Sequence, residues 1–346
     1  MALPILVKLG IAALFPLAAL AQQQNTGTIV YTHAPDHSAP WPVNDIYAMG
    51  GDGSNVKALT NDGHSHSPSW SPDGRQILFI HDSTLRTKPA YRETKEFESH
   101  HPIELYVMDA DGTNRRLLRR LEPVIYSAAW SPDGKTLAIS CLPEAAVNPS
   151  QTADQPTGAG LFLLPADGKG ELRLLIRNAF TPSWSPDGKK IAFSVDYPRG
   201  KWSVHVADSD GFHDVQLTDP DRTAGSPAWS PDGKQIAFGE LGGKQISVMD
   251  ADGSHARQLT YDPNWSCSHP SWSPDGNRIV FSCSAASAPC GGFSSIGTAL
   301  PVCVRRIFTI SMGDPNAKSI QLNQHDGAFP AFAPTGLRLS AQSSND

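Results

Sequence analysis

The sequence predicts an all-β fold, a six-bladed β-propeller of four-stranded antiparallel blades whose ring is closed by pairing of the N- and C-terminal strands. Three observations predict it: a recurring motif, four strand-like segments in each repeat, and complementary segments at the two ends. The copies are "SWSPDGRQILF" from Ser69, "AWSPDGKTLAI" from Ala129, "SWSPDGKKIAF" from Ser183, "AWSPDGKQIAF" from Ala228, "SWSPDGNRIVF" from Ser271 and the altered "AFAPTGLRLS" from Ala331.

Each repeat reads as two hairpins in succession. In the fifth copy, "SHPSW" is a short strand, "SPDG" a tight turn and "NRIVFS" a strand rich in β-branched and aromatic residues. In the fourth copy, "KQISVMD" and "RQLT" form two further strands around the turn "ADGSHA". One repeat is therefore a four-stranded propeller blade.

One aromatic residue recurs at the end of the first strand of every repeat. We expect these residues to pack one blade on the next, with a sugar-stacking platform as the alternative: Trp70, Trp130, Trp184, Trp229, Trp272 and Phe332. The aspartates of "SPDG" and "DADG" are expected to be turn residues, because a calcium loop needs more oxygen ligands at regular spacing.

Ring closure follows from the incomplete first repeat. "GTIVYT", "NDIYAM" and "VKALT" read as second, third and fourth strands that lack a first strand, and "FPAFAPTG" near the C-terminus supplies one. The sequence leaves open whether Thr28–Thr32 or Leu337–Gln342 completes this closing blade.

The first 21 residues are predicted to be a cleaved secretory signal peptide. They contain one lysine, an apolar run and the small-residue end Ala19-Leu20-Ala21, and an uncleaved anchor is disfavoured by the short run and Pro16. Residues 22–346 are expected to form a single propeller domain that is periplasmic or secreted, is monomeric and has no transmembrane segment. The net charge of −6 argues against nucleic acid, which requires clustered positive charge.

Export permits disulfides, and the chain has five cysteines. Cys267 and Cys283 are placed to face each other across the hairpin centred on "SPDG", and Cys290 and Cys303 bracket an insertion. We predict the disulfides Cys267–Cys283 and Cys290–Cys303. Cys141 occupies the repeat position of Cys283 but faces Ile125, so it is expected to be the free thiol.

The long connections between second and third strands, and the links between blades, should share one face of the disc, which we call the loop-rich face. Long loops on a rigid scaffold commonly carry binding residues. The residues expected on this face, as candidates for contacting a ligand or partner, are Asp62, His64, His66, Arg222, Trp265, His269, His325 and Asp326. His64, His66 and His269 are candidate ligands for a divalent metal, although polar loops alone account for many histidines.

The pattern "PxWSPDGxxIAF…LYVMDADGxxxRxLT" resembles the WD-like repeat of the TolB family, and it covers Thr28 to about Ser340. The same repeat occurs in propellers of dipeptidyl-peptidase-type enzymes. TolB itself has an α/β domain before its propeller, and we expect that domain to be lacking here. No "GxSxG" elbow of a hydrolase is present.

Two functions from different classes are consistent with these residues. The first is an exported, non-enzymatic, TolB-like module that binds a protein or peptide in the cell envelope and needs no cofactor. The alternative is a metal-dependent carbohydrate-active enzyme, a lyase or hydrolase, that uses histidines of the loop-rich face. Convergence of three or more such side chains would distinguish the second from the first.

Overall fold

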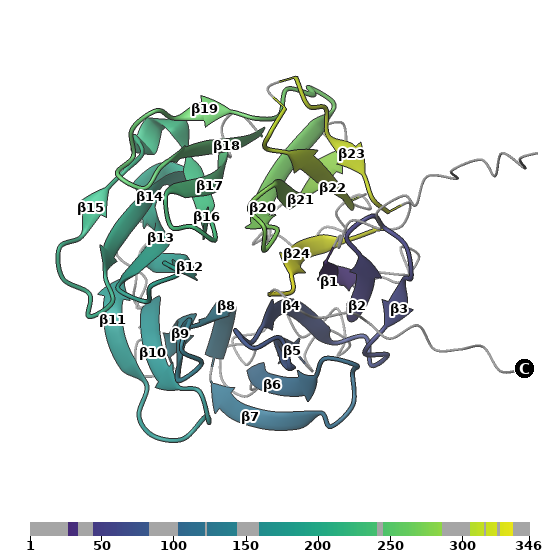
Figure 1. Cartoon of the computed structure of the whole chain (residues 1–346). Coiled ribbons are helices and arrows are strands. Elements are labelled where there is room, and N and C mark those ends of the chain that lie inside the picture. The colour runs from purple at the N-terminus through teal and green to yellow at the C-terminus, as the bar shows by residue number, and fades with distance from the viewer. Residues whose placement is uncertain are drawn as a thin grey trace, which may run out of the picture.

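The computed structural model describes residues 27–33, 44–82, 103–121, 123–143, 159–240, 245–285, 305–314, 316–323 and 326–334. These residues form six four-stranded antiparallel sheets arranged around a central axis (Figure 1). The predicted six-bladed propeller is therefore confirmed. The signal-peptide segment, His325, Cys290, Cys303 and Leu337–Gln342 lie outside the described residues.

Each blade begins with a strand next to the axis and ends with a strand at the rim, which has only 2 residues in blades 1, 4, 5 and 6 (Figure 1). Blade 1 contains β24 (Ala328–Phe332), β1 (Thr28–His33), β2 (Asp45–Gly50) and β3 (Lys57–Ala58). Blade 2 contains β4 (Ser65–Trp70), β5 (Gln76–Asp82), β6 (Ile103–Asp109) and β7 (Arg116–Leu121). Blade 3 contains β8 (Pro123–Trp130), β9 (Thr136–Pro143), β10 (Gly160–Pro165) and β11 (Arg173–Arg177).

The second half of the ring repeats this plan. Blade 4 contains β12 (Ala179–Trp184), β13 (Lys190–Tyr197), β14 (Lys201–Asp208) and β15 (Val215–Gln216), with the 3-10 turn η5 (Pro198–Gly200) between β13 and β14. Blade 5 contains β16 (Ala224–Trp229), β17 (Gln235–Glu240), β18 (Gln245–Asp250) and β19 (Arg257–Gln258), preceded by η6 (Pro220–Arg222). Blade 6 contains β20 (Trp265–Trp272), β21 (Arg278–Ala285), β22 (Arg305–Ser311) and β23 (Ile320–Gln321).

The closing blade joins the two ends of the chain. β24 pairs antiparallel with β1, with Ile29 opposite Phe332 and Val30 opposite Ala331. Because β1 also pairs with β2, Thr28–His33 takes the place beside the C-terminal strand. The prediction that the terminal strands close the ring is confirmed.

The core lies between neighbouring blades, because strand residues alternate between the two faces of each sheet. Phe79, Phe193, Phe238 and Phe281 are fully buried at the same place in blades 2, 4, 5 and 6. The repeated aromatic residues also bridge blades. Trp70 donates its indole N–H to the carbonyl of Ala331 in blade 1, at 3.3 Å.

The innermost strands are kinked where they line the axis. In five blades the residue three positions before the repeated aromatic has positive φ, and the register of the strand pair shifts there: Ser67, Thr181, Ser226, His269 and Phe329. This is a β-bulge, which bends the strand and increases its twist. Because the feature recurs around the ring, the left-handed backbone of His269 belongs to the architecture and is no sign of an active site.

None of the helical segments in the described part of the chain has the length and apolar character that crossing a membrane requires.

Candidate functional site

One face of the disc, which we call the turn face, carries the Ser-Pro-Asp-Gly turns. In each turn the carboxylate is already engaged. Ser71 donates its hydroxyl to Asp73 at 2.7 Å, and the backbone N–H of Arg75 donates to the same oxygen at 3.0 Å. These bonds hold the pKa of Asp73 below its usual range. The same two bonds recur at Asp133, Asp187, Asp232 and Asp275.

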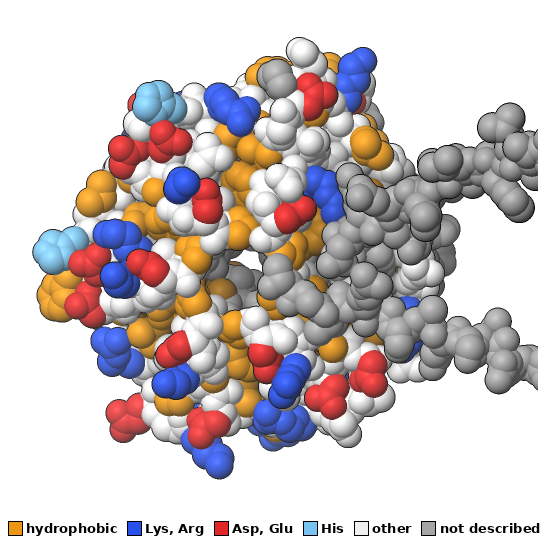
Figure 2. All heavy atoms as spheres, in the orientation of Figure 1, with side chains coloured by type: hydrophobic (Ala, Val, Ile, Leu, Met, Phe, Trp, Pro, Cys, Tyr) orange, Lys and Arg blue, Asp and Glu red, His pale blue; other side chains and the backbone are white. Residues whose placement is uncertain are grey.

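Acidic and basic side chains are interspersed around a central opening on the side of the disc seen in Figure 2. Within the turns, opposite charges neutralise each other, as Lys234 lies 3.7 Å from Asp232. Exposed ion pairs of this kind contribute little to the free energy of unfolding. Because their charges cancel, this part of the surface has neither a positive nor a negative patch.

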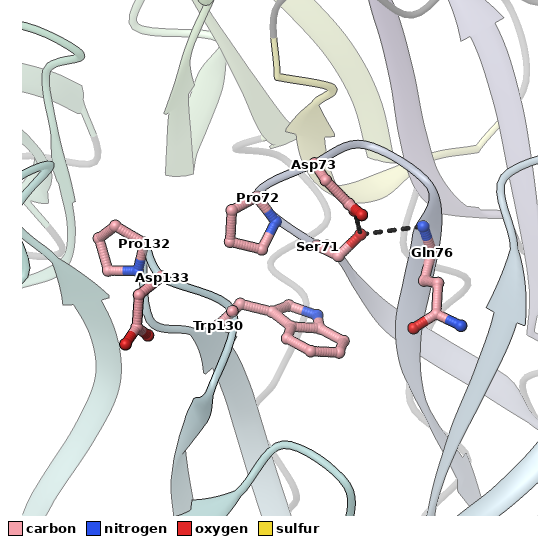
Figure 3. A pocket seen from close by; sticks show the side chains of 8 residues that line it. Ser71, Pro72, Asp73, Gln76, Trp130, Pro132 and Asp133 are labelled. Carbon is pink, nitrogen blue, oxygen red and sulfur yellow. Dashed lines mark hydrogen bonds between the residues drawn. The ribbon is translucent and has the colours of Figure 1, made fainter.

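A shallow hollow of about 440 Å³ lies on this face between the turns of blades 2 and 3 (Figure 3). Pro72 and Pro132 border it, with Trp130 beneath. Its polar groups form hydrogen bonds within the turn, as the backbone N–H of Gln76 donates to the hydroxyl of Ser71 at 2.9 Å. Pro132 in turn lies 3.7 Å from where a Cβ on Gly188 would stand, so the turns follow one another around the ring. The hollow is therefore a gap between two successive blade turns, and we assign it no ligand.

The loop-rich face holds the predicted ligand residues, and most of them have partners within the chain. Asp62 accepts from Arg115, and from the backbone N–H of His64 at 2.9 Å. Burial opposes ionisation of Asp62, but these bonds outweigh it and hold its pKa below the usual value. The guanidinium of Arg115 also contacts His81 Nδ1 at 2.9 Å and lies 4.6 Å from the centre of the Tyr106 ring. These contacts stabilise the connection between blades 1 and 2.

The remaining predicted residues are spread around the ring. Arg222 forms an ion pair with Glu240 at 2.8 Å. Trp265 packs its ring against Phe308 with the centroids 5.2 Å apart. Asp326 is buried and accepts the backbone N–H of Arg305 at 3.2 Å.

His66 and His269 lie on the innermost strands of blades 2 and 6. Burial lowers the pKa of each imidazole to about 4. At His66 the charge of Asp82 opposes this lowering and His81 strengthens it. At His269 the positive charge of Arg305 lowers the pKa further. His269 Nδ1 lies 2.8 Å from the hydroxyl of Ser268, and its ring lies against Phe329. Both imidazoles are therefore neutral near pH 7.

The predicted metal ligands do not converge within the described residues. No three His, Cys, Asp or Glu side chains among them are grouped as a metal site requires. His64 Nδ1 lies instead 3.0 Å from the carbonyl of Asp82.

A Ser-His-Asp arrangement occurs in blade 4, where sequence reasoning expected none. Ser203 Oγ lies 2.9 Å from His205 Nε2, and His205 Nδ1 lies 2.8 Å from Asp214. These distances match a hydrolytic triad. However, Ser203 is fully buried, and the Tyr197 hydroxyl contacts the same Nε2 at 3.1 Å. A substrate carbonyl cannot reach Ser203, so the network stabilises the blade.

The cysteines follow the predicted arrangement as far as the structure describes them. Cys267 and Cys283 lie opposite each other in β20 and β21 and form a disulfide. Cys141 lies opposite Ile125 and is a free thiol in the described part of the chain. Burial raises the pKa of this thiol to about 12, so it is unreactive at neutral pH.

Sequence reasoning missed an aromatic group at the loop-rich end of blades 3 and 4. The rings of Tyr126 and Phe180 meet edge to face at 5.2 Å, and Phe180 meets Trp202 in the same way at 5.2 Å. Tyr126 remains 43% exposed. A signal was available, because Tyr126 and Phe180 both stand four residues before a repeated tryptophan in an innermost strand.

Asp196 lies beside this aromatic group. It is paired with Trp202 across β13 and β14, and its charge acts on Tyr126. Among the described residues no hydrogen bond or ion pair engages its side chain, and burial alone raises the pKa of its carboxyl group. Asp196 is thus a half-buried carboxylate beside aromatic rings that has no counter-ion in the described part of the chain.

Comparison with known sequences finds matches to part of the repeat region. The profile of the TolB beta propeller domain matches residues 160–289. The chain is 25% identical over 191 residues to an uncharacterized peptidase, YuxL, of Bacillus subtilis, covering 48% of this chain and 26% of that protein. It is 33% identical over 97 residues to the Tol-Pal system protein TolB of Anaeromyxobacter, covering 27% of this chain and 19% of that protein. The matched region thus spans about a quarter or less of these relatives.

Comparison of structures agrees with the repeat. A putative TolB from Agrobacterium tumefaciens superposes with a TM-score of 0.61 at 20% identity, covering 87% of this chain and 90% of that one. TolB from Acinetobacter baumannii superposes with a TM-score of 0.64 at 18% identity, covering 90% of this chain and 67% of that one. Identities at this level show a shared fold.

Proposed function

Because the chain is a TolB-like β-propeller protein, we propose that it works as an exported, non-enzymatic module that binds a protein or peptide of the cell envelope through its loop-rich face. The leader-like residues 1–21 support export, and the named role of a relative in the Tol-Pal system supports an envelope setting. The module needs no resident metal in this proposal. Fold alone does not define a function, so the site must carry the argument.

The observation that carries the proposal is a contrast between the two ends of the innermost strands. At the turn face, five blades present the same Ser-Pro-Asp-Gly turn with its carboxylate satisfied. Four residues before the repeated aromatic, toward the loop-rich face, every blade has a different residue: His66, Tyr126, Phe180, Gly225, Ser268 and Ala328. A residue that every blade repeats serves the scaffold, whereas residues that differ on one scaffold are free to match a partner.

Site-specific photo-crosslinking tests the proposal. A photoreactive phenylalanine would replace Arg199 or Tyr261, which are exposed on the loop-rich face, or Lys135 or Lys234 on the turn face. Each variant would be expressed with its leader in the source cell and irradiated in intact cells. We expect adducts to one envelope protein from the first two positions and none from the last two. Equal adducts from both faces, or none from either, would refute it.

N-terminal sequencing of the exported protein tests the leader, with Gln22 expected as the first residue. Elemental analysis of the same sample tests the absence of a stoichiometric metal. An intact Met1, or one bound zinc or manganese per chain, would contradict the corresponding part of the proposal.

A further inference from the structure

We propose that Asp196, Tyr126 and Trp202 form a binding site for an arginine side chain of the partner protein, at the loop-rich end of blade 4 next to the innermost strand of blade 3. This rests on the proposed function, because it names the chemistry by which the partner is recognised. β8 of blade 3 and β12 of blade 4 lie side by side next to the axis (Figure 1).

Strand pairing assembles the site. Trp202 stands opposite Asp196, and Phe180 stands opposite Ser194, two residues before Asp196. Residues two apart in a strand share a face, and directly opposed residues have Cβ atoms about 4.5–5.5 Å apart. Asp196, Phe180 and Trp202 therefore lie on the same side of blade 4. Tyr126 reaches Phe180 from the bulge of β8, where the register shifts between Ile125 and Ser127.

The chemistry of the site selects a cation. The face of an aromatic ring carries negative charge and attracts ammonium or guanidinium groups, and a carboxylate attracts the same groups. No described residue gives Asp196 a side-chain hydrogen bond or a counter-ion, so nothing in the described part of the chain compensates its charge. Two basic residues follow β13 closely. Lys201 pairs with Asp221, and no ion pair joins Arg199 to Asp196 among the described residues.

Access and shape favour an arginine. Tyr126 is 43% exposed and Asp196 and Trp202 are half-buried, whereas Phe180 is buried beneath them. A ligand can thus reach the carboxylate and two rings from solvent. A guanidinium is planar, stacks on aromatic rings and is more weakly hydrated than an ammonium, so it loses less hydration at a half-buried site.

The carboxylate also represents a stability cost that the fold alone does not explain. Burial disfavours its charged form, and a neutral side chain of the same size would avoid that cost. Local costs that persist without structural compensation are typical of functional sites.

The test uses three acetylated and amidated tripeptides with the mature protein, Gly-Arg-Gly, Gly-Lys-Gly and Gly-citrulline-Gly. Citrulline matches arginine in shape but is neutral. Binding is followed by the indole N–H resonance of Trp202, assigned with Trp202→Phe. We expect the arginine peptide to shift this resonance with an affinity at least tenfold higher than the citrulline peptide and severalfold higher than the lysine peptide.

Two substitutions locate the binding. Asp196→Asn should weaken binding of the arginine peptide at least tenfold, and Tyr126→Leu should weaken it severalfold. Asp210→Asn removes an exposed carboxylate from the turn that follows β14 of the same blade and serves as the control, so it should leave binding unchanged. Equal binding of arginine and citrulline, unchanged binding in Asp196→Asn, or no shift at millimolar peptide would overturn the proposal.

The crosslinking experiment separates this inference from the proposed function. The photoreactive residue at position 199 or 261 is combined with Asp196→Asn. If the yield of partner adducts is undiminished, the proposed binding function is supported and the arginine site is wrong. If the arginine peptide binds as expected but no position crosslinks a protein, the site stands as a cation site and the envelope-partner function is wrong.

Discussion

The indole N–H of Trp272 donates to the carbonyl oxygen of Ala228 in the neighbouring blade, at 3.0 Å. The equivalent nitrogens of Trp130, Trp184 and Trp229 are buried and meet no acceptor among the described residues. The same residue at the same repeat position thus makes a hydrogen bond at one blade boundary and lacks it at another.

This difference predicts unequal costs for the same substitution. Trp272→Phe and Trp130→Phe remove the same volume, but only the first removes a hydrogen bond and leaves a carbonyl without its donor. We expect Trp272→Phe to lower the free energy of unfolding by about 1 kcal/mol more than Trp130→Phe, as measured by urea denaturation. Equal losses would show that the indole bond contributes nothing.

The Cys267–Cys283 disulfide joins strands that already pair. Removing both sulfurs in Cys267→Ala/Cys283→Ala should lower the free energy of unfolding by roughly 2–3 kcal/mol, because the closed loop is short. A reducing agent should lower the free energy of unfolding of the parent protein by a similar amount. If the reducing agent also lowers it in the double variant, the chain contains another disulfide. A parent protein insensitive to reductant would contradict the prediction.

Neutral His66 and His269 predict acid sensitivity. Each has a pKa of about 4 in the folded protein, against 6.5 when exposed. Between these values the unfolded chain binds the proton and the folded chain does not, so the stability contributed by the neutral forms is lost as pH falls from 6.5 toward 4. His66→Asn/His269→Asn should flatten the decline of Tm over this range, while His255→Asn, at an exposed histidine, should leave it unchanged. An unaltered slope in the double variant would contradict the prediction.

Asp196 predicts the opposite trend. Its folded pKa lies above the unfolded value, so the folded protein holds the proton more tightly and this carboxyl destabilises the fold as pH rises through that interval. Asp196→Asn should therefore raise Tm by about 1 °C at pH 7, the scale of a partly exposed site, and the gain should vanish below pH 3.8. Asp221→Asn, which breaks only an exposed ion pair, should give no such gain. A lower Tm in Asp196→Asn at pH 7 would show that the carboxylate has a stabilising partner.

Much of the fold could be predicted because the same strand and turn pattern occurs six times in the sequence. Trp70 and its counterparts, the Ser-Pro-Asp-Gly turns and the leftover strands Thr28–His33 and Ala328–Phe332 follow from local pattern alone. The opposition of Cys267 and Cys283 also followed, because register within a hairpin is set by its turn.

The candidate site was less predictable, because its residues come from different blades. Histidines of the loop-rich face suggested a metal, but the structure gives His64 and Asp62 partners within the chain. Asp196 and Tyr126 drew no notice in the sequence, since they are 70 residues apart and share no motif.

The sequence by itself thus determined the number of blades, the strands within each, the closure of the ring and the Cys267–Cys283 pair, since all of these depend on short-range periodicity and turn chemistry. Tertiary structure alone decided which side chains meet across blade boundaries. It buried Ser203 within an otherwise catalytic arrangement, and it placed Asp196 beside Trp202 with no counter-ion in the described part of the chain. The physical reason is that burial and charge compensation depend on all neighbours in space, and in a propeller many of those neighbours belong to another repeat.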